Sequence, residues 1–169
     1  MDIQTAKLMT AMVQYDQGDA KRIQHFIKVH NLAAVIGKME SLEEDMQCIL
    51  ETAAILHDIG IHISEQKYGS SSGKYQEIEG PAEAEKLMLQ VGGYSNEQIE
   101  RVKYLIGHHH TYKNMVGLDY QILVEADFLV NLYEDASPHS AVESVRSKIF
   151  KTQTGIRLLD DMFGEKSCE

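Results

Sequence analysis

A histidine and an aspartate stand side by side at His57-Asp58 and are followed by Ile59-Gly60. A neutral imidazole and a carboxylate are ligands that suit a divalent transition metal. Successive residues of a helix project about 100° apart. His57 and Asp58 can therefore share an ion only if the ion lies between the directions of their side chains. Gly60 favours a helix C-terminus, where the negative end of the helix dipole attracts a cation. The alternative interpretation is a helix-end histidine next to a surface aspartate, because this dipeptide is common by chance.

Two further residues of ligand type lie in apolar surroundings. His25 follows an apolar helical stripe in the segment Arg22-Ile-Gln-His-Phe-Ile-Lys-Val29. Asp127 has apolar neighbours on both sides, and because an unpaired buried carboxylate is costly, a cation or hydrogen-bond donors are expected beside it. Taken alone, His25 is also explained as a core histidine. Asp127 is also explained by an arginine partner or a helix-end hydrogen bond.

The elements that must position these residues are predicted to be helices. The chain has only two prolines and twelve glycines, and no segment shows the alternation of a strand. The fold class is therefore all-α, and 169 residues is an ordinary length for one domain. The expected helices cover residues 3–16, 19–38, 41–60, 81–92, 95–109, 119–130 and 137–152, with a short one at 155–163.

Several of these helices have recognisable start signals. Asp19 is a suitable N-cap, and residues 41–44 and 95–98 have the pattern of a capping box. Pro81 is expected to occupy the first position of its helix, where proline is favoured. Residues 61–80 are polar and weakly periodic around Ser70–Lys74, which predicts a loop with at most one helical turn; a long loop of this kind is often functional.

Composition excludes several classes of protein. Sixteen Lys and Arg against twenty-six Asp and Glu leave a net charge of −10 without any basic run, so binding to a nucleic-acid polymer is not expected. The two cysteines, Cys48 and Cys168, form no disulfide framework, which favours a reducing compartment. The chain shows neither a membrane-length apolar stretch nor the pattern of a signal peptide at residues 1–14, so we expect a cytoplasmic protein.

Together, the order and spacing of His25, His57-Asp58 and Asp127 resemble those of the HD-domain superfamily of metal-dependent phosphohydrolases. The likeness runs from about residue 19 to 134 and is carried by Arg-x-x-His-x-x-x-Val, Ala-x-x-Leu-His-Asp-Ile-Gly and Ala-Asp-Phe-Leu. It implies a compact multi-helix bundle in which these four residues are the metal ligands. The whole chain, residues 1–169, is then one such domain, with residues 137–163 as its C-terminal helices.

The chain also departs from the family pattern. Where many members have a histidine before Gly80, this sequence has Glu79, and Ile61 stands where a lysine is common. The resemblance implies that any second, weaker ion is held by Glu79 and His109, the latter next to His108 or His110. A solvated helix end is the alternative for these three histidines. The candidates to bind the substrate phosphate are Arg22, Lys67, Lys74 and His108, and the two lysines belong to the predicted loop, which would close over the phosphate.

The expected function is therefore hydrolysis of a small phosphate ester, phosphomonoester or phosphodiester, with a nucleotide as the leading class. The cofactor is a divalent ion of unknown identity among Mn, Fe, Co, Ni, Zn and Mg. Asp58 would bridge two ions or orient the attacking water, and Glu79 or Glu77 would assist as general base. The main alternative is a non-catalytic metal- or nucleotide-binding module with a sensing or scaffold role. A non-nucleotide phosphate ester and, less favoured, a two-iron oxygenase are further alternatives.

Overall fold

The computed structural model describes residues 1–164, and within this range the regular structure consists of α-helices only. The all-α fold class is thus confirmed. Cys168 lies outside the described residues. The helices are α1 (Ile3–Tyr15), α2 (Ala20–Met39), α3 (Glu44–Leu56), α4 (Ile61–Tyr68), α5 (Gly73–Val91), α6 (Asn96–Ile106), α7 (Leu118–Glu134), α8 (His139–Lys148) and α9 (Gln153–Phe163).

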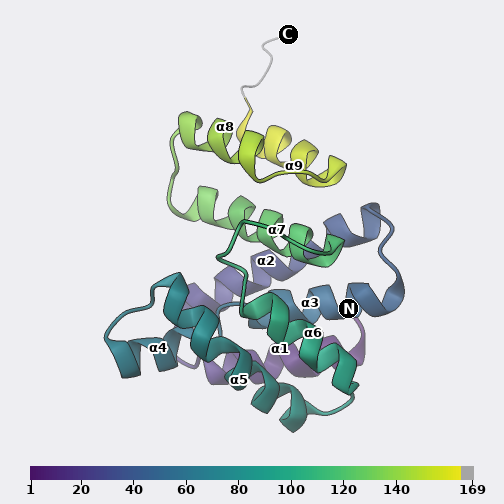
Figure 1. The fold of residues 1–169 in the computed structure, drawn as a ribbon, viewed down its shortest axis with the longest axis vertical. Helices are drawn as coiled ribbons and strands as arrows, with labels where there is room; N and C mark the ends of the chain where they lie inside the picture. Colours follow the sequence, from purple (N-terminus) through teal and green to yellow (C-terminus); the bar gives the residue numbers. More distant parts are fainter. Residues whose placement is uncertain (165–169) are drawn as a thin grey trace.

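Helices α2 and α7 pack against each other in the middle of the molecule (Figure 1). The α8–α9 pair covers α7 at one end, and α1, α4 and α5 lie toward the other. Helix α3 joins the two halves because it packs on α2, α6, α7 and α1. The central helices bury most of the apolar core, including Phe26, Ile36, Leu50, Leu56, Ile106, Leu123 and Leu129. Among the described residues, no helix is long and apolar enough to cross a membrane.

Two of the expected start signals act as predicted. The Asp19 side chain accepts a hydrogen bond from the backbone N–H of Arg22 and caps α2. Ser95 and Gln98 form a reciprocal capping box at the start of α6. The pattern at Ser41 was misleading, because this residue belongs to the end of α2. It takes a left-handed φ of 60°, and the next N–H, from Leu42, bonds to the carbonyl of Gly37 in a Schellman motif.

The prediction of a loop over residues 61–80 is wrong. Helix α4 occupies residues 61–68, and α5 begins at Gly73, so Pro81 lies inside α5 and does not start it. A proline inside a helix removes one N–H···O bond, here the one that would reach the carbonyl of Glu77. Helix α5 continues through Pro81 and packs on α4 and α6. Such contacts are long-range, and local sequence signals do not report them.

Candidate metal centre

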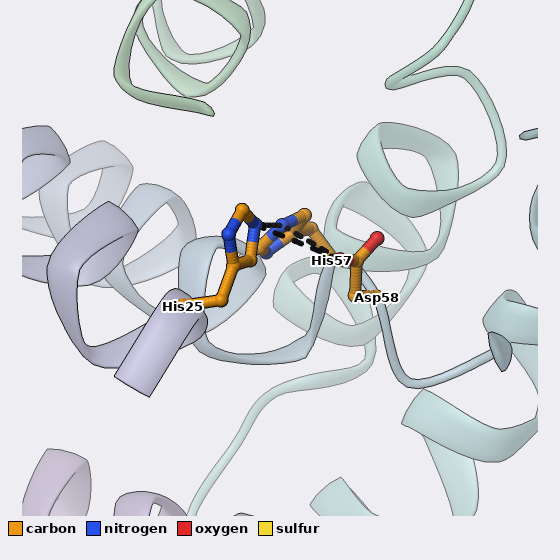
Figure 2. Close-up of side chains that lie close together, drawn as sticks. All are labelled: His25, His57 and Asp58. Carbon is orange, nitrogen blue, oxygen red and sulfur yellow. Dashed lines mark hydrogen bonds and ion pairs between the residues drawn. The ribbon is translucent and has the colours of Figure 1, made fainter. Parts of the chain in front are cut away.

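Three elements bring the predicted ligands together. His25 lies in α2, the His57-Asp58 pair follows directly after α3, and Asp127 lies in the middle of α7. The turn after the pair packs tightly against α5: a Cβ on Gly60 would lie 2.8 Å from the carbonyl oxygen of Gln76. Figure 2 shows the His25 side chain reaching toward the His57 ring, with Asp58 beside it.

The ligand atoms of His25 and His57 lie close to each other and to a carboxylate oxygen of both Asp58 and Asp127. Nε2 of His25 lies 3.2 Å from Nε2 of His57, and also 3.2 Å from Oδ1 of Asp127. Oδ2 of Asp58 lies 3.6 Å from Nε2 of His25 and 3.5 Å from that of His57. Neighbouring donors around an ion with bonds of about 2.0–2.1 Å are themselves about 2.8–3.4 Å apart, depending on whether the ion has six ligands or four. The spacing therefore suits a first-row divalent ion.

Each imidazole of the cluster is also held through its other nitrogen. Nδ1 of His57 bonds to the carbonyl of Ala54, and Nδ1 of His25 faces the carboxylate of Glu134 at 3.1 Å. A partner at Nδ1 fixes the tautomer and leaves the Nε2 lone pair available to a metal. Asp127 is oriented likewise, because Asn131 donates to its Oδ1.

The charges of the cluster balance each other. Burial lowers the pKa of His57, but the carboxylates of Asp58 and Asp127 outweigh this effect and raise it to about 9. Burial also opposes the charged form of Asp58, yet His57 and His109 bring its pKa down to about 2. Two carboxylates and two basic imidazoles form a donor set that can exchange protons for a divalent cation. The residues present thus fit a metal ion.

A second group of ligand atoms adjoins the first through Asp58. Its members are Asp58, His109 and His110, whose ligand atoms all lie within 4.8 Å of one another. Nδ1 of His109 bonds to the carbonyl of Ile106, and Nε2 is 3.5 Å from Oδ1 of Asp58. In the described part of the chain, the Nε2 atoms of His109 and His110 are buried without a hydrogen-bond partner. Orphaned imidazole nitrogens beside a carboxylate are what a second cation would use.

The sequence does not decide whether His108 or His110 lies beside His109 at the second group. The structure places His110 there, and its neighbours explain why. Gly73 at the start of α5 leaves room for the ring, because a Cβ there would lie 2.6 Å from it. Glu77 accepts hydrogen bonds from the His110 N–H and from the Thr111 hydroxyl. Burial and the neighbouring His109 lower the pKa of His110 to about 4, so this ring is neutral near pH 7 and open to a metal.

Other predicted residues lie apart from these two groups. Both carboxylate oxygens of Glu79 are engaged, one by Lys67 Nζ at 2.6 Å and the other by the Tyr68 hydroxyl at 2.7 Å. Lys74 is exposed in the first turn of α5. The His108 ring stacks on Tyr104 and bonds to its carbonyl. The structure therefore does not place Glu79 beside His109.

Arg22, in contrast, lies next to the ligand cluster. It lines a cavity of about 290 Å³ together with His25, Asp58, Asn131 and five more residues: Asp19, Lys21, Ile61, Glu134 and Asp135. Its guanidinium is held by Glu65 at 2.7 Å and by His62 Nδ1 at 3.0 Å. Lys67 and Lys74 do not line this cavity.

Sequence reasoning missed two residues that orient the cluster, Asn131 and Glu134. A usable signal existed, because Asp127, Asn131 and Glu134 are spaced i, i+4 and i+7 and share one face of a helix. That face of α7 points at α2, where His25 lies.

Comparison with known proteins gives one match. The model of the HD domain matches residues 22–141, more than two thirds of the chain, and this range contains every ligand described above. No curated protein and no solved structure matches the chain significantly. HD domains are in general metal-dependent phosphohydrolases. Because this model matches more than half of the chain, the chain belongs to the HD-domain family.

Proposed function

We propose that the protein is a metal-dependent hydrolase of a small phosphate ester, with nucleotides as the leading substrate class. The observation that carries this proposal is the cluster of His25, His57, Asp58 and Asp127, of which His25 and Asp58 line an open cavity together with Arg22. A closed structural metal site would leave no such space. An open coordination site beside a cavity is the arrangement of catalytic metals.

Each residue of the site has a role that follows from its position. A divalent ion in this cluster supplies Lewis acidity, which acidifies bound water and neutralises phosphoryl oxygens. Asn131 holds the Asp127 carboxylate toward the two imidazoles. Arg22 offers the phosphate a positive charge that Glu65 and His62 hold in place. Glu79 as general base remains a proposal that requires its contacts with Lys67 and Tyr68 to break.

The proposal is tested by turnover of a panel of phosphate esters with Mn²⁺, Fe²⁺, Co²⁺, Ni²⁺, Zn²⁺ or Mg²⁺. The panel contains nucleoside monophosphates, cyclic and dinucleotides, and non-nucleotide phosphate esters. Metal-dependent release of phosphate or of a nucleotide supports the proposal. Metal binding without turnover of any ester would instead favour the alternative, a metal- or nucleotide-binding module without catalysis.

Replacement of Arg22 by Gln is expected to raise KM for the substrate found in the panel about 10–100-fold, because a charged hydrogen bond is worth about 1.5–3 kcal/mol. The double variant Lys67→Ala/Lys74→Ala should change KM less, since neither lysine lines the cavity. Steady-state kinetics at saturating metal measures both. A larger effect of the double variant would show that the substrate phosphate binds near Lys67 and Lys74, on α4 and α5.

His109→Ala is expected to leave the ion at the first cluster in place and to lower activity. The ring belongs only to the second ligand group, so its loss weakens a second ion or removes a donor to phosphate. Metal titration of the variant separates these roles, because excess metal restores activity only if the ring binds a second ion. His139→Ala, an exposed histidine in α8, is the control. Wild-type activity of His109→Ala without added metal would contradict any role for this ring.

A further inference from the structure

We infer that Glu134 is a positioning residue for the metal ligand His25, an inference that rests on the metal binding proposed above. Glu134 is the last residue of α7, and its Oε2 lies 3.1 Å from Nδ1 of His25. When Nδ1–H donates to this carboxylate, the opposite nitrogen, Nε2, carries the lone pair. That lone pair then faces the atoms of His57, Asp58 and Asp127.

His25 differs from the other histidines of the site in the kind of partner it has. Nδ1 of His57 and Nδ1 of His109 bond to backbone carbonyls at the C-terminal ends of α3 and α6, where such carbonyls are free. His25 lies inside α2, where the carbonyls are used by the helix itself. Its Nδ1 therefore takes a side chain from another helix, and that side chain is an anion.

The Glu134 carboxylate is fixed from both sides. Its Oε1 lies 2.6 Å from Nζ of Lys28, which stands one turn after His25 on α2. The carboxylate therefore lies between the ammonium group of Lys28 and the His25 ring. Helix α7 thus supplies the ligand Asp127 and, two turns later, the residue that orients the ligand of α2.

An anionic partner at Nδ1 makes an imidazole a stronger ligand and holds its ring in one orientation. Loss of such an outer partner typically costs about 10–100-fold in metal affinity. Glu134→Gln keeps the size of the side chain and an oxygen that can accept from Nδ1, but it removes the charge and the ion pair with Lys28. We expect this variant to bind metal at least about 10-fold more weakly.

The test measures the affinity of the full chain for Zn²⁺ and, separately, for Mn²⁺ by competition with a chromophoric chelator. Asp135→Asn is the matched control, because it removes the same charge from the neighbouring residue in the same cavity, and its side chain makes no contact with His25 among the described residues. Weaker binding by Glu134→Gln with near wild-type affinity in Asp135→Asn supports the inference. Equal affinities in the two variants overturn it.

Two further readouts separate positioning from mere stabilisation. A structural role alone would lower the unfolding temperature of Glu134→Gln while leaving the affinity of the folded variant at the wild-type value, which would overturn the inference. If the variant does not fold, nitrogen-15 spectra of the wild-type histidines decide, because His25 must carry its proton on Nδ1 when metal is bound. Failure of the wild type to bind either ion would end the proposed function too, whereas wild-type binding with an unaffected Glu134→Gln ends this inference alone.

Discussion

Asp58→Ala should remove nearly all bound metal and all metal-dependent activity. The Asp58 carboxylate is the only group shared by the two ligand clusters in the described chain: Oδ2 faces His25 and His57, and Oδ1 faces His109. Its loss therefore removes an anionic ligand from both positions at once. We expect metal affinity to fall by more than the roughly 100-fold upper range for an outer partner such as Glu134.

Elemental analysis after dialysis and chelator competition measure this effect directly. Asp135→Ala is the control for metal content, because Asp135 lines the same cavity but does not belong to either ligand group. Circular dichroism checks that Asp58→Ala keeps its helices. Equal metal occupancy in the wild type and in Asp58→Ala would show that the cluster is not the metal site.

Gly60→Ala should both destabilise the protein and disturb the metal site. The φ angle of Gly60 is −71°, so alanine is allowed by the backbone and the expected effect is purely one of space. A Cβ there would lie 2.8 Å from the Gln76 carbonyl oxygen and 2.9 Å from the Gly80 backbone nitrogen. Both are backbone atoms of α5, so the His57-Asp58 turn and α5 must separate. Overpacking of this kind costs about 1–3 kcal/mol, measured as the loss in free energy of unfolding in urea.

Gly69→Ala provides the matched comparison for this prediction. Gly69 has a φ of +64° and open space around its Cα, so alanine there pays a backbone cost of about 1–2 kcal/mol without pushing helices apart. The two variants can therefore lose similar stability, but only Gly60→Ala should also lose metal affinity. Unchanged metal affinity in Gly60→Ala would mean that the turn holds its ligands without the close packing on α5.

Local patterns in the chain were enough to predict every described helix except α4 and the first part of α5. Asp19 and the Ser95–Gln98 box act on backbone groups three residues away, so residues close in the sequence are enough to predict their effect. The signals failed where distant contacts decide the outcome. Helices α4 and α5 fill most of residues 61–80, where they pack on each other and α5 also packs on α6. Ser41 lies just after the end of α2, although it resembles a helix start.

The sequence by itself determined the types of residue that can bind a metal, the all-helical class and the resemblance to the HD domain. These follow from side-chain chemistry, from the helical period and from the order of motifs. None of the three requires knowledge of contacts between distant parts of the chain. Which nitrogen each histidine turns toward the site was decided only by the tertiary structure. Glu134 contacts His25 although the two are 109 positions apart in the sequence, and the Glu79 carboxylate bonds to Lys67 and Tyr68. Such pairings depend on how helices cross, and no local pattern specifies the crossing of two helices far apart in the chain.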